Sequence, residues 1–248
     1  MSTLRISAEG APRRPRRIGH KGAGHIAPGN TLAGFDAALA HGCDMIEFDV
    51  LPERPDGSGE LLLAHDYEDL RGRSVLTLEE GLDHLCGAAF ARVELNVDLK
   101  LPGYEARVVK ALRERDIEDR VLISTMEEVS LPAVREASSV VRLGWSVPRV
   151  RRDYLSHWAT RPLALATVRV LRRSVPRAVA RRLHRGEIDA CMSHFSLVTP
   201  RFVSTVQQAG GELYVWTVDD ADRIRRFEAM GVAGITTNDP RLFDAPAA

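Results

Sequence analysis

The sequence is poor in cysteine and carries no excess charge of either sign. Its cysteines, Cys43, Cys86 and Cys191, lie far apart and are odd in number, which matches neither a disulfide framework nor a cysteine metal site. We therefore expect reduced thiols in a cytoplasmic protein. The 248 residues include 34 acidic and 34 basic side chains, and this balance argues against a dedicated nucleic-acid-binding protein. We accordingly expect no nucleic acid among its partners.

Long apolar segments and glycine-rich phosphate loops are also missing. No apolar run approaches the roughly 20 residues that span a membrane, and residues 1–17 lack the apolar centre of a secretory signal. Arginines and prolines dominate residues 12–17, so we interpret residues 1–16 as a flexible basic segment and residues 17–248 as one domain. No glycine fingerprint of a dinucleotide site or a P-loop follows any predicted strand.

What the sequence does contain is a regular alternation of short extended runs and longer amphipathic segments. Strands are expected at residues 17–22, 44–51, 93–99, 121–125, 141–147, 190–195, 212–218 and 234–237, and helices at 31–41, 77–86, 104–115, 131–137, 200–209 and 221–230. Such alternation predicts parallel βα units, and a closed α/β barrel of the TIM (β/α)8 type fits both the count and the length. An open doubly wound sheet is the alternative fold. An extended run at 60–64 and the region 148–186 fall outside this rhythm.

Two carboxylates share one face of the strand predicted at 44–51. Because side chains alternate along a strand, Glu47 and Asp49 point to one side while Ile46, Phe48 and Val50 point to the other. Such a pair is costly unless water, a basic group or a hard cation neutralises it, and carboxylate oxygens are the ligands of Mg²⁺ and Ca²⁺. The pair predicts a metal site at the end of this strand, with a solvated strand face as the alternative.

Further polar residues follow the carboxyl ends of most predicted strands, where the active sites of TIM barrels lie. They include His20, Lys21, His65, Asp98, Lys100, Ser124, Thr125, Ser193, His194, Trp216, Thr217, Thr237, Asn238 and Asp239. Together with Glu47 and Asp49 they offer carboxylates for a divalent cation, lysines for a phosphoryl group and histidines for proton transfer. This inventory indicates metal-assisted phosphoester chemistry.

Seven short motifs, taken in order, resemble those of the glycerophosphodiester phosphodiesterase family over residues 17 to 243. They are His20-Lys21-Gly22, Pro28-Gly29-Asn30-Thr31, Glu47-Phe48-Asp49, His65-Asp66, Leu95-Asn96-Val97-Asp98-Leu99-Lys100, Trp216-Thr217-Val218 and Thr237-Asn238-Asp239-Pro240. The resemblance implies a TIM barrel whose divalent metal, Mg²⁺ or Ca²⁺, is bound by Glu47, Asp49 and Asp98. It also implies His20 and His65 as the catalytic acid–base pair, and Lys21, Asn30, Lys100 and Trp216 as substrate-binding residues, with Trp216 near the glycerol end.

The chain departs from the family pattern at four places. Lys21 stands where arginine is usual, Gly29 where glutamate is usual and Asp98 where glutamate is usual. Lysine keeps the charge without the bidentate fork, and aspartate is a shorter ligand but still a ligand. The stretch between His65 and Thr77 is too short for the inserted subdomain common in the family. We therefore expect a more open site, which a larger diester such as a lysophospholipid can enter.

The irregular region is rich in arginine. Residues 149–185 contain eleven arginines against one acid, Asp153, with apolar residues between them. One interpretation is a basic amphipathic flap that contacts anionic lipid head groups. The other is a solvated helical excursion whose apolar residues pack on the barrel.

The sequence thus predicts a metal-dependent phosphodiesterase of lipid metabolism that hydrolyses glycerophosphodiesters to glycerol 3-phosphate and an alcohol. Three alternatives remain open at this point. They are a lysophospholipase D-like activity, a different barrel metalloenzyme such as an enolising lyase, and a catalytically silent barrel that binds phosphodiesters.

Overall fold

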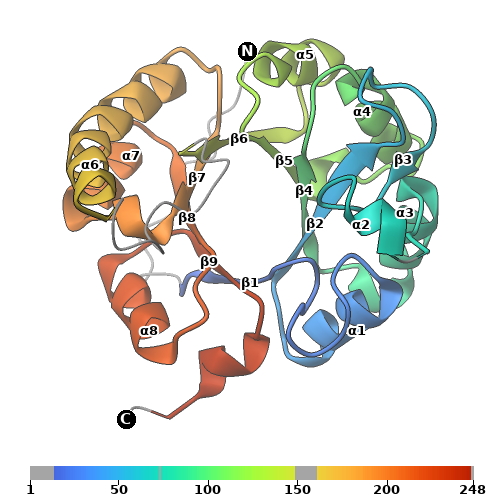
Figure 1. Cartoon of the computed structure of the whole chain (residues 1–248), viewed down its shortest axis with the longest axis horizontal. Coiled ribbons are helices and arrows are strands. Elements are labelled where there is room, and N and C mark those ends of the chain that lie inside the picture. Colours follow the sequence, from blue (N-terminus) through green and yellow to red (C-terminus); the bar gives the residue numbers. More distant parts are fainter. Residues whose placement is uncertain (1–13, 73, 149–160, 247–248) are drawn as a thin grey trace.

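Eight parallel strands form a closed barrel with helices around it (Figure 1). The computed structural model describes residues 14–72, 74–148 and 161–246. The barrel strands are β1 Arg16–Gly19, β2 Met45–Pro52, β4 Glu94–Leu99, β5 Val121–Thr125, β6 Arg142–Val147, β7 Ala190–His194, β8 Glu212–Trp216 and β9 Gly234–Thr237. The barrel is closed because β1 pairs in parallel with both β2 and β9. The predicted TIM barrel is confirmed, and the open sheet is excluded.

Helices cover the outside of the barrel. They are α1 Leu32–Ala40, α2 Asp69–Gly72, α3 Leu78–Leu85, α4 Glu105–Arg113, α5 Ser130–Ala137, α6 Arg161–His184, α7 Pro200–Gln208 and α8 Ala221–Met230, with 3₁₀ turns at Ala88–Phe90, Glu118–Arg120, Phe195–Leu197 and Pro240–Asp244. The Thr31 side chain accepts a hydrogen bond from the backbone N–H of Gly34 at the start of α1. Thr77 and Glu80 form a capping box at the start of α3.

The first strand is shorter than the sequence predicts. β1 ends at Gly19 instead of residue 22, so His20 and Lys21 lie in the loop that follows it. Lys21 has a φ of 53° and Gly22 a φ of 87°, both in the left-handed region, where a strand cannot continue. The loop therefore turns back at the mouth of the barrel and brings both polar side chains to the strand ends.

The connection between His65 and Thr77 is as short as the sequence indicates. The extended run predicted at 60–64 contains only β3 Leu61–Leu62, which pairs antiparallel with the end of β2 and lies outside the barrel. The described part of the following connection contains the four-residue helix α2. The described part of this connection contains no inserted subdomain, and α2 is its one helical turn.

The arginine-rich region forms a single long helix where the structure describes it. Within α6, Val175 and Val179 are buried against the barrel, and Val168, Leu171 and Leu183 are partly buried against the core. The predicted helical excursion is thus confirmed over 161–184, whereas residues 149–160 lie outside the described residues. Among the described helices, none is both long enough and apolar enough to cross a membrane.

The barrel interior is layered. At the amino ends of the strands, Arg16 contacts Glu94 at 3.0 Å and Glu212 at 2.9 Å, and Arg142 also pairs with both acids. Burial alone raises the pKa of Glu212, but the two arginines overcome this effect and hold that pKa below its usual value. Above this network lies an apolar layer that includes Ile18, Met45, Leu122, Ala190 and Met192. These layers form a closed floor, so any ligand enters from the carboxyl ends of the strands.

The division into a basic segment 1–16 and one domain from residue 17 stays a prediction. Residues 1–13 lie outside the described part of the chain, and β1 begins at Arg16.

Candidate active site

A cavity of about 190 Å³ opens at the carboxyl ends of the strands. Its lining includes His20, Glu47, His65, Asp98, Lys100 and Trp216. A larger cavity of about 600 Å³ lies at the opposite end, but its acids and arginines largely pair with one another there. In TIM barrels the chemistry takes place at the carboxyl ends, so the smaller cavity is the candidate active site.

The three predicted carboxylate ligands lie together at this cavity, where Glu47 and Asp98 belong to its lining and Asp49 is buried beside them. Asp49 on β2 lies directly beside Asp98 on β4 in the strand register, and Glu47 lies on the same face of β2. One oxygen from each of Glu47, Asp49 and Asp98 lies within 4.8 Å of the others. Glu47 and Asp49 are buried, with 6% and 0% of their surface exposed, so the alternative of a solvated strand face is wrong. Three hard oxygen donors on adjacent strands fit Mg²⁺ or Ca²⁺.

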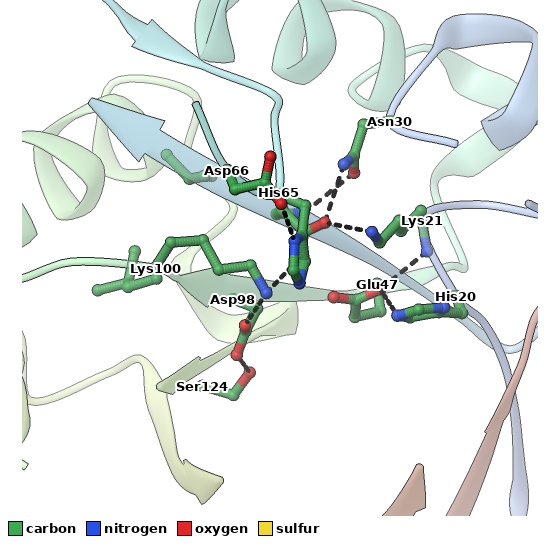
Figure 2. A network of polar contacts seen from close by, with 12 residues as sticks. His20, Lys21, Asn30, Glu47, His65, Asp66, Asp98, Lys100 and Ser124 are labelled. Atoms are coloured by element: carbon green, nitrogen blue, oxygen red, sulfur yellow. Dashed lines mark hydrogen bonds and ion pairs between the residues drawn. The ribbon is translucent and has the colours of Figure 1, made fainter. Parts of the chain in front are cut away.

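Two lysines offset part of the charge of this acidic group. Lys100 Nζ lies 2.5 Å from Asp49 Oδ1 and 2.6 Å from Asp98 Oδ2, and Lys21 Nζ lies 3.4 Å from Asp49 Oδ2 (Figure 2). Burial disfavours the charge on Asp49, but the lysines outweigh it and lower the pKa of that carboxyl. Burial likewise acts against the charge on Lys100, yet the facing carboxylates raise its pKa. Both groups are therefore held in their charged forms.

Glu47 is the carboxyl group whose charged form the two lysines do not stabilise enough to offset burial. Burial first, and the neighbouring Asp49 second, raise the pKa of Glu47 to about 8. Its Oε2 accepts a hydrogen bond of 2.8 Å from the backbone N–H of Lys21. Near neutral pH the metal-free site therefore keeps a proton on Glu47. With all three carboxylates ionised, the two lysines would leave one negative charge uncompensated, and a divalent cation would supply the missing positive charge in place of that proton.

Asn30 orients Asp49. Its Nδ2 donates to Asp49 Oδ2 at 2.9 Å, and its Oδ1 accepts from the Asp49 backbone N–H at 3.1 Å. Asn30 is 1% exposed, and its φ of 57° places it in a tight turn whose N–H bonds to the Lys21 carbonyl. The structure thus places Asn30 where it orients the Asp49 carboxylate, whereas its role in substrate binding stays a prediction.

Two departures from the family pattern lie against each other. A Cβ atom on Gly29 would stand 2.9 Å from Cβ of Lys21. A side chain at position 29 would therefore displace the Lys21 stem, which now passes over the glycine toward Asp49. We infer that glycine at position 29 accommodates the lysine at position 21.

The two histidines lie in different surroundings. His20 Nδ1 lies 2.6 Å from Asn238 Oδ1, its Nε2 lies 3.9 Å from Glu47 Oε2, and burial lowers its pKa. His65 is about half exposed, and its Nδ1 lies 3.0 Å from Asp66 Oδ2. His20 is thus a partly buried ring whose pKa is lowered, whereas His65 is a half-exposed ring beside a carboxylate. Two rings in such different positions can serve opposite steps of proton transfer.

Several polar atoms of the cavity have no hydrogen-bond partner among the described residues. They are Trp216 Nε1, Thr236 Oγ1 and Asn96 Oδ1, all buried and all on residues that line the cavity. Buried polar atoms are normally paired, so these three are free for a ligand or water. Thr236 was not selected from the sequence, because this residue lies before the last residue of its strand. Asn96 was named only as part of the motif from Leu95 to Lys100.

Ser124 has a supporting role. Its Oγ donates to Asp98 Oδ1 at 2.6 Å from the adjacent strand β5, which leaves Oδ2 of Asp98 beside Lys100 (Figure 2). The sequence placed Ser124 at the site without assigning it a partner. Its hydrogen bond sets which oxygen of Asp98 faces the cavity.

A comparison with protein-family models matches residues 20–71 and 89–242 to the glycerophosphoryl diester phosphodiesterase family. The chain belongs to this family. The predicted resemblance and the predicted class of enzyme, a phosphoric diester hydrolase, are thereby confirmed. The unmatched residues 72–88 cover the second part of the connection after His65 and helix α3.

Individual members of the glycerophosphodiester phosphodiesterase family are similar to this chain over most of their length. A glycerophosphodiester phosphodiesterase of Caldanaerobacter subterraneus is 26% identical to this chain, and the alignment covers 93% of that protein and 90% of this chain. The solved structure of a glycerophosphodiester phosphodiesterase from Parabacteroides distasonis has a TM-score of 0.70 at 16% identity, with 93% of this chain and 95% of that chain covered. That of an Oleispira antarctica phosphodiesterase, in complex with the product sn-glycerol-3-phosphate, has a TM-score of 0.65 at 18% identity, with 94% and 98% covered.

Proposed function

We propose that this enzyme hydrolyses glycerophosphodiesters to glycerol 3-phosphate and an alcohol with the help of Mg²⁺ or Ca²⁺, as a step of lipid metabolism. The observation that carries the proposal is the convergence of three carboxylates, two lysines and two histidines on one cavity. The neighbour from Oleispira antarctica was solved with sn-glycerol-3-phosphate, which is the product that this reaction yields.

Glu47, Asp49 and Asp98 are the residues that would hold the cation. When bound, the cation supplies positive charge that stabilises the negative charge on the phosphoryl oxygens. Lys21 and Lys100 add fixed positive charge from the two sides of Asp49. Lysine acts here as a point charge and not as a bidentate clamp.

His20 and His65 divide the proton transfers. We assign the base to His20, because burial favours its neutral form and its Nε2 faces Glu47 across the cavity. His20 then removes the proton of the attacking hydroxyl, from water or from the substrate itself. We assign the acid to His65, because its ring lines the cavity and its Nδ1 lies 3.0 Å from Asp66 Oδ2, which orients the ring. His65 then protonates the oxygen of the leaving alcohol.

The unpaired polar atoms of the cavity suit a polyol. Trp216 Nε1 is a donor, Asn96 Oδ1 is an acceptor and Thr236 Oγ1 is both. Glycerol hydroxyls can satisfy all three, whereas an apolar ligand would leave them buried and unpaired. This supports the placement of Trp216 at the glycerol end of the site.

We propose that lysophospholipids are further substrates beside small glycerophosphodiesters. The support is the short connection after His65, in which only the single turn α2 is described, together with the half-exposed His65 ring. The enolising lyase is not supported, because the chain belongs to a phosphodiesterase family. A silent barrel is not favoured either, since both histidines and all three carboxylates meet at one cavity.

A substrate panel tests this function directly. Glycerophosphocholine, glycerophosphoethanolamine and a lysophospholipid would each be incubated with Mg²⁺, with Ca²⁺ and with a chelator, and glycerol 3-phosphate and the free alcohol would be measured. We expect cation-dependent release of both products from at least the first two substrates. Turnover that a chelator leaves unchanged would contradict the proposed role of the carboxylates.

We also propose that the enzyme is cytoplasmic and contacts an anionic membrane surface through residues 149–185. Among the described part of this region, Arg169, Arg173, Arg177 and Arg181 recur every fourth residue on α6. All four are exposed and have no acidic partner among the described residues, and Val170 beside them is 63% exposed. A row of arginines around an exposed apolar side chain suits anionic head groups. The packing of Val175 and Val179 on the barrel equally supports a structural role for the inner face of α6.

Vesicle binding separates the two roles of α6. We expect the parent protein to co-sediment with phosphatidylglycerol vesicles at low salt and not with phosphatidylcholine vesicles. Replacing Arg169, Arg173 and Arg177 by glutamine should weaken binding roughly 100-fold, because each arginine near an anionic surface contributes about 1 kcal/mol. The matched control replaces three exposed arginines elsewhere, Arg92, Arg201 and Arg226, by glutamine. No binding of the parent protein at low salt, or equal loss in both variants, would refute the membrane contact.

A further inference from the structure

His20 is held from behind by a chain of two side chains that ends in a carboxylate. Its Nδ1 lies 2.6 Å from Oδ1 of Asn238, which directly follows β9. Nδ2 of Asn238 donates to Asp219 Oδ2 at 2.7 Å, and Asp219 lies in the loop after β8. Three segments far apart in the sequence thus meet behind the ring of one histidine.

The carboxylate fixes which way the Asn238 amide points. A carboxylate only accepts hydrogen bonds, so the NH₂ group of Asn238 has to face Asp219. Its carbonyl oxygen then faces His20, and because a carbonyl only accepts, Nδ1 of His20 must carry the proton. In the neutral ring this leaves Nε2 unprotonated, with its lone pair on the side of Glu47 and the cavity.

The loop around this chain is firmly bonded. Asp219 Oδ1 accepts from the Asn238 backbone N–H at 2.8 Å and from the Thr237 hydroxyl at 3.0 Å. The backbone carbonyl of Asn238 accepts a hydrogen bond from the backbone N–H of His25 at 3.0 Å. A Cβ on Gly24 would stand 3.2 Å from Asn238 Oδ1, so glycine leaves room for that oxygen beside the imidazole. Asn238 therefore has little freedom to turn over.

We propose that Asn238 and Asp219 are positioning residues that select the tautomer of His20 with the proton on Nδ1, so that Nε2 is free to accept a proton from the attacking hydroxyl. The catalytic consequence rests on the proposed function, whereas the tautomer itself does not. During the reaction the proton from the hydroxyl goes to Nε2, and the charged ring then donates from Nδ1 to Asn238, whose amide Asp219 continues to hold.

Exchange of the two residues gives a sharp test. Asn238→Leu removes the acceptor of His20, and Asp219→Asn removes the group that forces the Asn238 amide to point one way. The double variant Asp219→Asn, Asn238→Asp restores every hydrogen bond with the two side chains exchanged. The control is Asp220→Asn, which changes the neighbouring carboxylate, a cap of α8 that is not bonded to Asn238.

The first measurement is the ¹⁵N NMR spectrum of the His20 ring in the metal-free protein. We expect a protonated Nδ1 and an unprotonated Nε2 in the parent, the control and the double variant, and a mixture of tautomers in Asp219→Asn. An unprotonated Nδ1 in the parent, or an unchanged spectrum in both Asn238→Leu and Asp219→Asn, would overturn the proposal. This readout needs no turnover, so it stays decisive if the enzyme prefers another substrate.

The second measurement separates positioning from binding. We expect kcat for a glycerophosphodiester to fall about 10- to 100-fold in Asn238→Leu, as for other residues that orient a functional side chain, with KM changed only a few-fold. The double variant should recover most of kcat. A merely structural role would instead lower the thermal midpoint and leave the double variant as slow as the single ones, and that result would count against the proposal.

Discussion

With His20 replaced by alanine, turnover of glycerophosphodiesters is expected to fall by about 10²- to 10⁴-fold, the range that general acid–base catalysis contributes. The ring lines the cavity, and its Nε2 lies 3.9 Å from Glu47 Oε2. Its loss leaves the three carboxylates and both lysines in place. Cation binding, measured by calorimetry, should therefore persist while kcat falls.

A second histidine provides the contrast. His65→Ala should lower kcat for glycerophosphodiesters to a similar degree. Its activity should recover with a substrate whose leaving group needs no proton, such as a nitrophenyl ester of glycerol phosphate. His20→Ala should show no such rescue, because the base acts on the attacking group. His184→Ala, at the exposed end of α6, is the matched control and should turn over normally. Rescue of His20→Ala instead of His65→Ala would reverse the assignment of acid and base.

Much of this site was predictable from local sequence because a parallel barrel gathers the ends of all its strands at one place. Alternation within a strand was enough to put Glu47 and Asp49 on one face, and the order of the strands put Asp98 beside them. What local sequence could not show is which of the gathered groups contact one another. The resemblance implied Asn30 as a substrate-binding residue, and nothing in the local sequence shows that its buried amide bonds to Asp49, because that contact is tertiary.

Three other features depended on conformations or contacts that no local pattern reveals. β1 ends at Gly19 because Lys21 adopts a left-handed conformation, which is rare for lysine and is not encoded in its residue type. Asp219 was not singled out, since its importance comes from a contact with Asn238 nineteen residues later. The region 148–186 falls outside the regular alternation of the sequence, yet residues 161–184 form one helix, α6, that continues through Pro176.

Glu47 and Asp49 are expected to affect stability in opposite directions, although both would hold the cation. In the metal-free protein Asp49 is fully buried and faces two lysines, so Asp49→Asn leaves buried positive charge without its partner. Removing one member of a buried ion pair typically costs about 3–5 kcal/mol. We expect a loss of unfolding free energy toward the lower end of that range, because Lys100 keeps its contact with Asp98.

Glu47→Gln should instead stabilise the metal-free protein near neutral pH. The pKa of Glu47 is raised to about 8, so between its ordinary value of 4.5 and about pH 8 the folded protein holds a proton that the unfolded chain has released. Stability therefore falls as pH rises through this window. Glutamine removes this dependence, so the gain in unfolding free energy should grow from pH 5 to pH 8, and it can be followed by urea denaturation at several pH values.

With the cation present, Glu47→Gln should be less stable than the parent protein, whereas without it the variant should be the more stable of the two. In the parent protein, Mg²⁺ or Ca²⁺ at a concentration well above its dissociation constant stabilises the fold, since it binds the folded state alone. Neither Glu47→Gln nor Asp49→Asn should gain this increment, and both should lose turnover. Equal stabilisation of the parent and both variants by the cation would place the metal elsewhere. If Glu47→Gln stays more stable only without the cation, the carboxylate is maintained for binding the metal at the expense of the metal-free fold.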